Sequence, residues 1–166
     1  NKNKISFPFK RYEISKVFRD GAVKVGRDRE FTQCDADVVG IKGQYIEAEL
    51  LLLFVKIFKE LNVDIIIKYN SRKLMTGLII ESGISEKLVP EVTTIIDKKD
   101  KLKTEEFNQM LFEVGLTNKQ IEKLNNYFQM NLSDLNQTFK DTNNTSIFRG
   151  LEEVNNLCEY LKRLEL

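Results

Sequence analysis

The sequence contains no histidine, only two cysteines and no long apolar run. Without histidine, the chain cannot supply a Ser-His-Asp or Cys-His nucleophile system, a histidine-ligated zinc site or a histidine general base. The longest strongly apolar run, residues 50–55, is too short to cross a bilayer, and no signal peptide precedes the first charges. We therefore expect no membrane association, and any chemistry must come from other side chains.

The two cysteines, Cys34 and Cys158, lie far apart in the sequence and form no CxxC pair. This spacing is typical of two reduced thiols in an intracellular protein rather than of a disulfide framework or a metal site. We expect both cysteines to be packing residues. We also expect the protein to be cytoplasmic and to have no structural metal.

The length and charge suit one ordinary domain or two small ones that can bury a core. The 166 residues are 42% hydrophobic, which argues against wholesale disorder. Residues 1–83 hold 15 Lys/Arg against 11 Asp/Glu, and residues 84–166 hold 11 against 14. The densest basic stretch, residues 10–29, has seven basic and three acidic side chains. Such a stretch could contact phosphate, although a solvated strand and loop is the more ordinary explanation.

Alternating polar and apolar residues predict two strands near the start of the chain. Residues 10–18 alternate, with Tyr12, Ile14 and Phe18 on the side that we expect to be buried. The alternation resumes over residues 29–38, and the connection is too short for a parallel crossover, so the pair should be antiparallel. Positions 29, 31, 33, 35 and 37 then share one face, which carries Arg, Phe, Gln and two carboxylates. That set is odd for a core and typical of a ligand site.

The rest of the chain is predicted to be mainly helical. We expect helices over residues 45–61 and 72–81, the second capped by Ser71, with a short buried strand over 64–69 between them. After Gly83 the strand signals vanish, and four helices are predicted, over 85–98, 104–114, 117–131 and 146–165. Thr104 and Thr117 are the predicted N-caps of the second and third. The expected fold is α+β: an antiparallel sheet with helices, followed by a small all-helical module.

One segment of the first half combines groups that bind nucleotides. Arg19 ends the first strand, Lys24 and Arg27 lie in a glycine-containing loop, and Phe31 and Gln33 lie on the returning strand. Guanidinium groups clamp phosphate oxygens and stay charged, and an aromatic ring can stack on a base with about 1–3 kcal/mol. Such a site works by positioning and by stabilising charge at phosphorus, so it needs no histidine. From the residues alone, an exposed hairpin with a core Phe remains the alternative.

This segment, VFRDGAVKVGRDREFTQCDADVVG at residues 17–40, resembles motif 2 of the class II aminoacyl-tRNA synthetases, and specifically that of the histidyl-tRNA synthetases. The resemblance continues through NSRKL at 70–74, Gly77-Leu78 and SGI at 82–84. IIDKKDK at 95–101 is similar to the start of that family's helical insertion. The motifs cover residues 7–103, and the resemblance over 104–166 rests on position and helical character.

The resemblance implies roles for individual residues. Arg19 matches the catalytic motif 2 arginine, which holds the α-phosphate of ATP and the carboxylate of the amino acid. Arg27 matches the loop arginine that reaches the outer phosphates, and Phe31 matches the phenylalanine that stacks on adenine. Gln33 and Asp37 match the pair that contacts the bound histidine, where the acidic residue is often the longer glutamate.

Other positions are implied less directly. Gly21 stands where the family often has a glutamate that contacts ATP, so that contact is missing or is made by the backbone. Lys98, Lys99 and Lys101 could touch tRNA phosphates, because the family's insertion domain lies over the acceptor arm; a solvated helix end is the alternative. The acidic balance of residues 84–166 restricts any such contact to a local one.

The resemblance also implies the partners and the extent of the molecule. ATP with Mg²⁺, histidine and tRNA(His) would be the substrates, and the parent protein would be a homodimer. Residues 1–83 would be part of the catalytic domain and 84–166 the insertion domain. Motif 1, an RGLDYY-like motif, motif 3 and the anticodon-binding domain are not in this sequence, so we expect an internal fragment that is inactive alone.

Two functions remain open at this stage. The first is a ligase that activates histidine as histidyl-adenylate and transfers it to tRNA(His). The second is a regulatory paralogue of histidine biosynthesis that does not aminoacylate. The motif 2 arginines, Phe31 and the long helical insertion favour the ligase.

Overall fold

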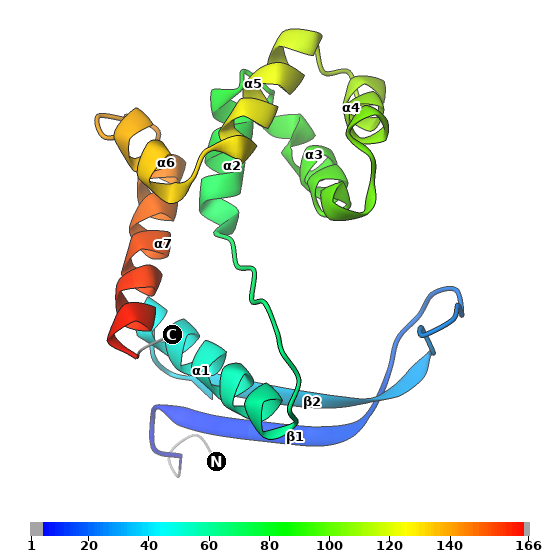
Figure 1. Cartoon of the computed structure of the whole chain (residues 1–166), viewed down its shortest axis with the longest axis vertical. Helices are drawn as coiled ribbons and strands as arrows, with labels where there is room; N and C mark the ends of the chain where they lie inside the picture. The colour runs from blue at the N-terminus through cyan, green and yellow to red at the C-terminus, as the bar shows by residue number, and fades with distance from the viewer. Residues whose placement is uncertain (1–4, 165–166) are drawn as a thin grey trace. The chain divides into compact units, whose positions relative to one another are not determined.

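The structure, a computed structural model, describes residues 5–164 and has an α+β fold (Figure 1). The described residues form two strands and seven α-helices, which confirms the predicted fold class. They divide into two compact units, residues 5–65 with Leu164, and residues 66–163. This division lies earlier in the chain than the predicted domain boundary at residue 83, and the assignment of 1–83 and 84–166 to two domains stays a prediction.

The first unit contains a long antiparallel hairpin, as predicted. Strands β1 (Phe9–Phe18) and β2 (Glu30–Val39) pair along their whole length, from Phe9 opposite Val39 to Phe18 opposite Glu30. Directly opposite residues of an antiparallel pair point to the same side of the sheet. The odd-numbered residues of both strands therefore share one face, which we call the site face, and the even-numbered residues share the other.

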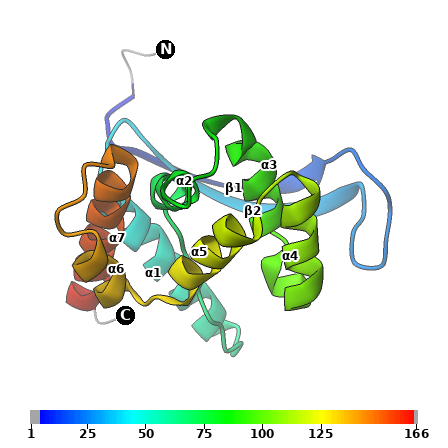
Figure 2. The same ribbon diagram turned by 90° about the horizontal axis from the view of Figure 1, so that it is seen from above.

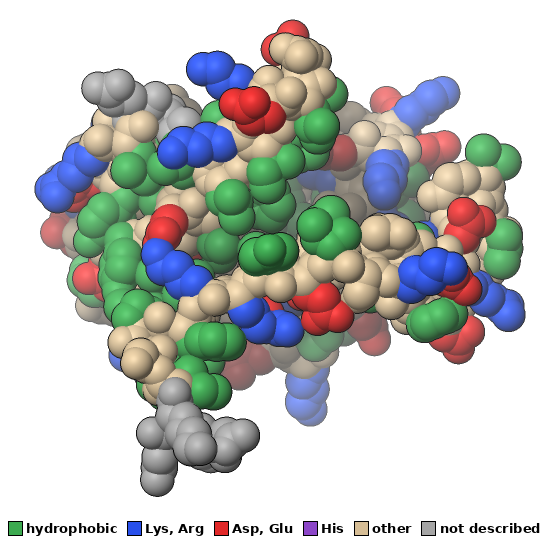
Figure 3. Space-filling view, turned by 90° about the horizontal axis from the view of Figure 1, so that it is seen from below, with side chains coloured by type: hydrophobic (Ala, Val, Ile, Leu, Met, Phe, Trp, Pro, Cys, Tyr) green, Lys and Arg blue, Asp and Glu red, His purple; other side chains and the backbone are tan. Residues whose placement is uncertain are grey.

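The prediction that Tyr12, Ile14 and Phe18 are buried is wrong. These side chains are 79%, 65% and 76% exposed, and Figure 3 shows hydrophobic side chains open to the surface among charged ones. The helix α1 (Gln44–Glu60) contacts this even-numbered face only near the far end of the hairpin, where Ala36 and Val38 are half-buried. Two strands and one helix give too little cover to bury a whole sheet face.

The predicted strand over residues 64–69 is also wrong. This segment has no strand pairing in the structure, and Ile66 is 90% exposed. The prediction followed from its β-branched residues. A strand is held by the hydrogen bonds of a neighbouring strand, and the only described sheet consists of β1 and β2.

The second unit is a helical module built around α2 (Arg72–Glu81). Its other helices are α3 (Val89–Ile96), α4 (Thr104–Glu113), α5 (Asn118–Gln129), α6 (Leu132–Thr138) and α7 (Thr145–Arg163). Figures 1 and 2 both show α2 between α7 on one side and α3 and α4 on the other. The largest fully buried side chains include Phe107, Leu111, Leu124, Val92 and Ile79.

Two glycines let α2 and α7 pack closely. A Cβ atom added at Gly150 would lie 2.3 Å from the backbone nitrogen of Leu74, and one added at Gly77 would lie 2.6 Å from Cγ1 of Ile147. Both distances are well inside van der Waals contact. Any larger residue would push the helices apart, so the glycines set this packing distance.

The predicted N-caps of α2 and α5 are confirmed, and the predicted N-cap of α4 is wrong. Ser71 accepts a hydrogen bond from the backbone N–H of Leu74 at 3.3 Å, and Thr117 forms a capping box with Gln120, as predicted. Thr104 is not the N-cap of α4, because Lys103 occupies that position and its backbone N–H donates to Glu106 at 3.2 Å.

The helix boundaries differ from the predictions at a few places. The helix predicted over 85–98 is a short 3₁₀ turn, Glu86–Leu88, followed by α3. The short helix α6 was missed, since its seven residues are too few for a clear hydrophobic period, although Asn131 and Asp134 form a capping box at its start. The predicted end of the last helix at residue 165 lies outside the described residues.

Candidate functional site

Basic side chains brace the end of the hairpin by bonding to its own backbone. The backbone N–H of Arg19 donates to the carbonyl of Arg29 at 2.9 Å, and the side-chain Nε of Arg19 donates to the carbonyl of Asp28 at 3.0 Å. In return, Arg29 Nε donates to the carbonyl of Gly21 at 3.1 Å. These bonds tie the first residues after β1 to the last residues before β2, so both ends of the loop are held in place.

The structure brings Arg19 and Phe31 together. The guanidinium carbon of Arg19 lies 4.4 Å from the centroid of the Phe31 ring, within cation–π range. The Phe31 side chain is half-buried on the site face, and the Arg19 side chain is exposed. A cation and a flat aromatic surface are thus presented side by side at the base of the loop.

Arg27 lies in the loop itself. Its backbone N–H donates to the carbonyl of Lys24 at 2.8 Å, and the Lys24 N–H donates back at 3.2 Å, which makes a tight turn around Gly26 (φ +72°). A Cβ atom at Gly21 would lie 3.9 Å from an Nη atom of Arg27, so the guanidinium is adjacent to Gly21. Because residue 21 is a glycine, that position offers the Arg27 guanidinium no carboxylate neighbour.

Gln33 and Asp37 follow on the same face of β2 as Phe31. Gln33 lies opposite Ser15, and Asp37 lies opposite Arg11. The Asp37 carboxylate is 2.5 Å from the Arg11 guanidinium, and their side chains are 42% and 46% exposed. The hydrogen bond to Asp37 and the negative charge of Asp37 raise the pKa of Arg11 above its ordinary value. Sequence reasoning missed Arg11, because its position opposite Asp37 follows from the strand register, which alternation alone does not fix.

The three predicted tRNA-contacting lysines differ in their surroundings. Lys98 and Lys101 are exposed. The ammonium of Lys99 lies over the ring of Phe128, 4.7 Å from its centroid, and is half-buried. Asp100 pairs with Lys68 at 2.9 Å, and this bond lowers the pKa of Asp100. The structure therefore leaves Lys98 and Lys101 more open to a phosphate than Lys99.

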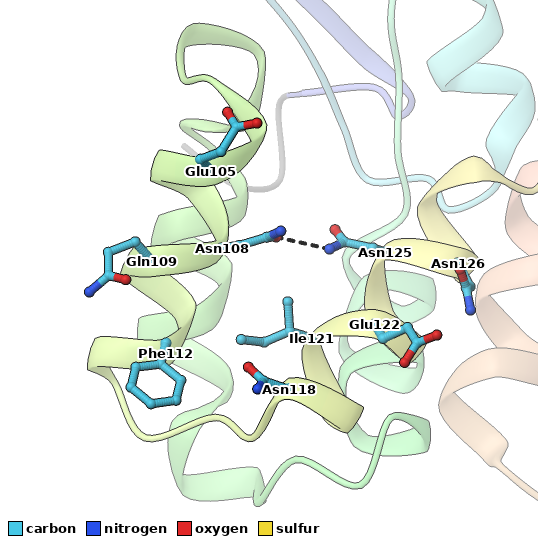
Figure 4. Close-up of a pocket in the computed structure, with 9 residues that line it drawn as sticks. All are labelled: Glu105, Asn108, Gln109, Phe112, Asn118, Ile121, Glu122, Asn125 and Asn126. Carbon is cyan, nitrogen blue, oxygen red and sulfur yellow. Dashed lines mark hydrogen bonds between the residues drawn. The ribbon is translucent and has the colours of Figure 1, made fainter.

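A groove between α4 and α5 in the helical unit has a volume of about 660 Å³ (Figure 4). Asn108 and Asn125 point toward one another across it and are joined by a hydrogen bond of 2.9 Å. Its lining includes the carboxylates of Glu105 and Glu122 and contains no lysine or arginine. This groove therefore repels phosphate rather than binding it.

The two cysteines are free thiols, as predicted, but they are not both packing residues. Cys34 is exposed on the even-numbered face of β2, which contradicts the prediction. Cys158 is half-buried, and its sulfur lies 2.8 Å from the hydroxyl of Tyr69. That hydrogen bond is the main reason why the pKa of Tyr69 is raised to about 12.

Residues 5–164 contain neither a metal-binding cluster nor a membrane-spanning helix. No group of three or more cysteine, aspartate or glutamate side chains there could hold a metal ion. None of the helices in that range is long and apolar enough to cross a membrane.

Comparison with known proteins places this chain beside one family, although no family model matches it. It is 40% identical over 161 residues to histidine–tRNA ligase 2 of Shouchella clausii, and the alignment covers 96% of this chain and 38% of that protein. It is 42% identical over 124 residues to histidine–tRNA ligase of Phocaeicola vulgatus, and that alignment covers 75% of this chain and 27% of that protein.

A solved structure agrees with these relatives. The crystal structure of histidyl-tRNA synthetase from Nostoc sp. PCC 7120 matches with a TM-score of 0.84 and 27% identity, over 99% of this chain and 39% of that one. The chain thus spans less than half the length of the proteins that it resembles.

Proposed function

We propose, taking this chain as a member of the histidyl-tRNA synthetase family, that it forms part of the active site of a histidine–tRNA ligase. The observation that carries the proposal is the packing of Arg19 on Phe31, on the same hairpin face as Gln33 and Asp37. That face presents a nucleotide-binding pair and an amide–carboxylate pair together. The names of the relatives, which cover nearly the whole chain, agree with this assignment.

The first half of the reaction would use the arginines and Phe31. In it, a carboxylate oxygen of histidine attacks the α-phosphorus of ATP, the bond to the β-phosphate breaks, and pyrophosphate leaves. Arg19 would stabilise the charge that builds up at the α-phosphate, and Arg27 would hold the leaving phosphates. Phe31 would stack on adenine and so fix the nucleotide beside Arg19. Mg²⁺ would enter with ATP as part of the substrate.

The amino acid would bind farther along the same face. The Gln33 amide and the Asp37 carboxylate both offer oxygen acceptors, and the Asp37 carboxylate suits an imidazole N–H. In the second half of the reaction, a terminal hydroxyl of tRNA(His) attacks the histidyl carbonyl and AMP leaves. Lys98 and Lys101 would each contribute a local contact to tRNA phosphate.

The same proposal covers the protein as a whole. The full protein would be a cytoplasmic homodimer with residues 84–166 as its insertion domain, and the 166 residues alone would not form histidyl-adenylate. A regulatory paralogue that binds histidine without activating it is the competing hypothesis, and the exposed arginine-bearing loop speaks against it.

The test is histidine-dependent ATP–pyrophosphate exchange by the full-length protein. Arg19→Ala should lower the exchange rate at least about a hundredfold, because it removes a charge that acts in the transition state. Lys16→Ala is the matched control, since Lys16 is an exposed cation on the even-numbered face of β1 and pairs with Glu30. Exchange at the wild-type rate in Arg19→Ala would contradict the assignment of Arg19 to the α-phosphate of ATP. Histidine binding with no exchange by the wild-type protein would favour the regulatory hypothesis.

A further inference from the structure

Arg11 and Asp37 are the only oppositely charged pair that the hairpin register places directly across the site face within the described strands. An Nη atom of Arg11 lies 2.5 Å from Oδ2 of Asp37. The two residues come from different strands, so the contact depends on the register and not on local sequence. A one-residue slip would move Arg11 to the other face and break it.

The ion pair does not use up the acceptor capacity of Asp37. Oδ2 faces Arg11, and the Asp37 side chain as a whole stays 42% exposed. A carboxylate has about four lone-pair sites, so one oxygen can be held by a guanidinium while the other accepts from a ligand. Arg11 therefore fixes the direction of the carboxylate without filling it.

Arg11 is itself held by its neighbours on β1. A second guanidinium nitrogen lies 3.4 Å from Glu13, and Glu13 accepts a hydrogen bond of 2.8 Å from the hydroxyl of Ser15. Ser15 lies directly opposite Gln33. A row of three linked polar side chains on β1 thus runs alongside Gln33 and Asp37 on β2.

We propose that Arg11 is a positioning residue that orients the Asp37 carboxylate toward the imidazole of bound histidine. The inference rests on the proposed function, which gives Asp37 the imidazole contact. An aspartate is one methylene shorter than glutamate and reaches less far, so it matters more that its rotamer aims the carboxylate at the ligand. Arg11 holds that rotamer from the neighbouring strand and reduces the ordering that histidine binding must otherwise impose.

The experiment measures the dissociation constant for histidine by calorimetry, and the KM for histidine and for ATP, in the full-length protein. Arg11→Gln should weaken histidine binding about tenfold, the lower end of the loss seen when a partner that orients a metal ligand is removed. The KM for ATP should not change. Arg11→Lys keeps the charge but loses the planar fork, so it should weaken histidine binding by a smaller factor, about threefold.

Lys10→Gln is the matched control. Lys10 is the next residue along β1, faces the other side of the sheet and pairs with Glu49 of α1. The variant removes the same unit of charge and should leave histidine affinity unchanged. Thermal unfolding of all variants separates loss of affinity from loss of fold, and if Arg11→Gln does not fold, Arg11→Lys decides the question.

The outcomes distinguish this inference from the proposed function. If Asp37→Asn weakens histidine binding and the Arg11 variants do not, the positioning role of Arg11 is wrong and the proposed function stands. If Asp37→Asn has no effect on histidine affinity, the assigned histidine contact is wrong. If Arg11→Gln adds little to Asp37→Asn in the double variant, the two residues act through one interaction, as the inference requires.

Discussion

The guanidinium of Arg19 lies 4.4 Å above the ring of Phe31, although the two residues belong to opposite sides of the hairpin loop. The stacked ring limits the orientations of a long and exposed side chain. The hydrogen bond from Arg19 Nε to the carbonyl of Asp28 limits them further. Arg19 is therefore largely pre-organised before any ligand arrives, which reduces the entropy cost of binding a phosphate.

Replacing Phe31 with leucine should weaken ATP binding. Leu keeps a comparable apolar volume but removes the flat surface, so both the base stacking and the platform for Arg19 are lost. A loss of about 1–3 kcal/mol for one stacked base corresponds to a rise in the KM for ATP of about fivefold to 150-fold. Phe18→Leu is the control, because Phe18 is exposed on the opposite face. Equal ATP KM values for the two variants would argue against stacking on Phe31.

Removing Lys98 and Lys101 together should reduce the salt dependence of tRNA(His) binding by the full-length protein. Each phosphate contact contributes about −0.7 to −0.9 to the slope of log K against log salt, so the double alanine variant should lower its magnitude by up to about 2. The matched control is the double alanine variant of Lys119 and Lys140, two exposed lysines elsewhere in the helical unit. A slope that changes equally in both variants would rule out a local contact.

Thr117→Ala should destabilise the protein by about 1 kcal/mol, because the side chain accepts from the backbone N–H of Gln120 at the start of α5. Thr104→Ala makes the same chemical change at the first residue of α4, where Lys103 is the N-cap. That control should cost only a few tenths of a kcal/mol or nothing. Urea denaturation measures both, and a loss for Thr104→Ala as large as for Thr117→Ala would contradict the assigned caps.

Glu153 should make the stability depend on pH on the acid side. Its carboxylate on α7 accepts from Lys73 and Ser71 at the start of α2, and the Lys73 bond is the main reason why its pKa is lowered. A lowered pKa stabilises the folded state above the pKa of the unfolded chain. This contribution is therefore present at pH 7 and is lost as the pH falls below about 4.5.

The measurement is the free energy of unfolding of wild type and Glu153→Gln across that pH range. The variant should be less stable at pH 7 by about 1 kcal/mol and should lose less stability on acidification. Glu152→Gln, at the exposed neighbouring position, should match the wild type at every pH. A wild type and Glu153→Gln that respond identically to acid would show that the Lys73 contact contributes nothing.

The predictions that held depend on short-range chemistry. Ser71 and Thr117 bond to backbone groups three residues away, so their roles can be predicted from the sequence alone. The hairpin follows from alternation and a short loop, and that hairpin places Phe31, Gln33 and Asp37 on one face. Arg19 beside Phe31 also follows from it, since both flank the same loop.

What the sequence by itself determined is thus the hairpin, the helices with strong periodicity, and the grouping of the candidate site residues. Tertiary structure decided the rest. The exposure of Tyr12 and Ile66 depends on which elements pack against them, and a pattern of apolar residues does not specify that partner. The pairing of Arg11 with Asp37 depends on strand register, because the two residues are far apart in the chain and only the hydrogen-bond ladder brings their charges together.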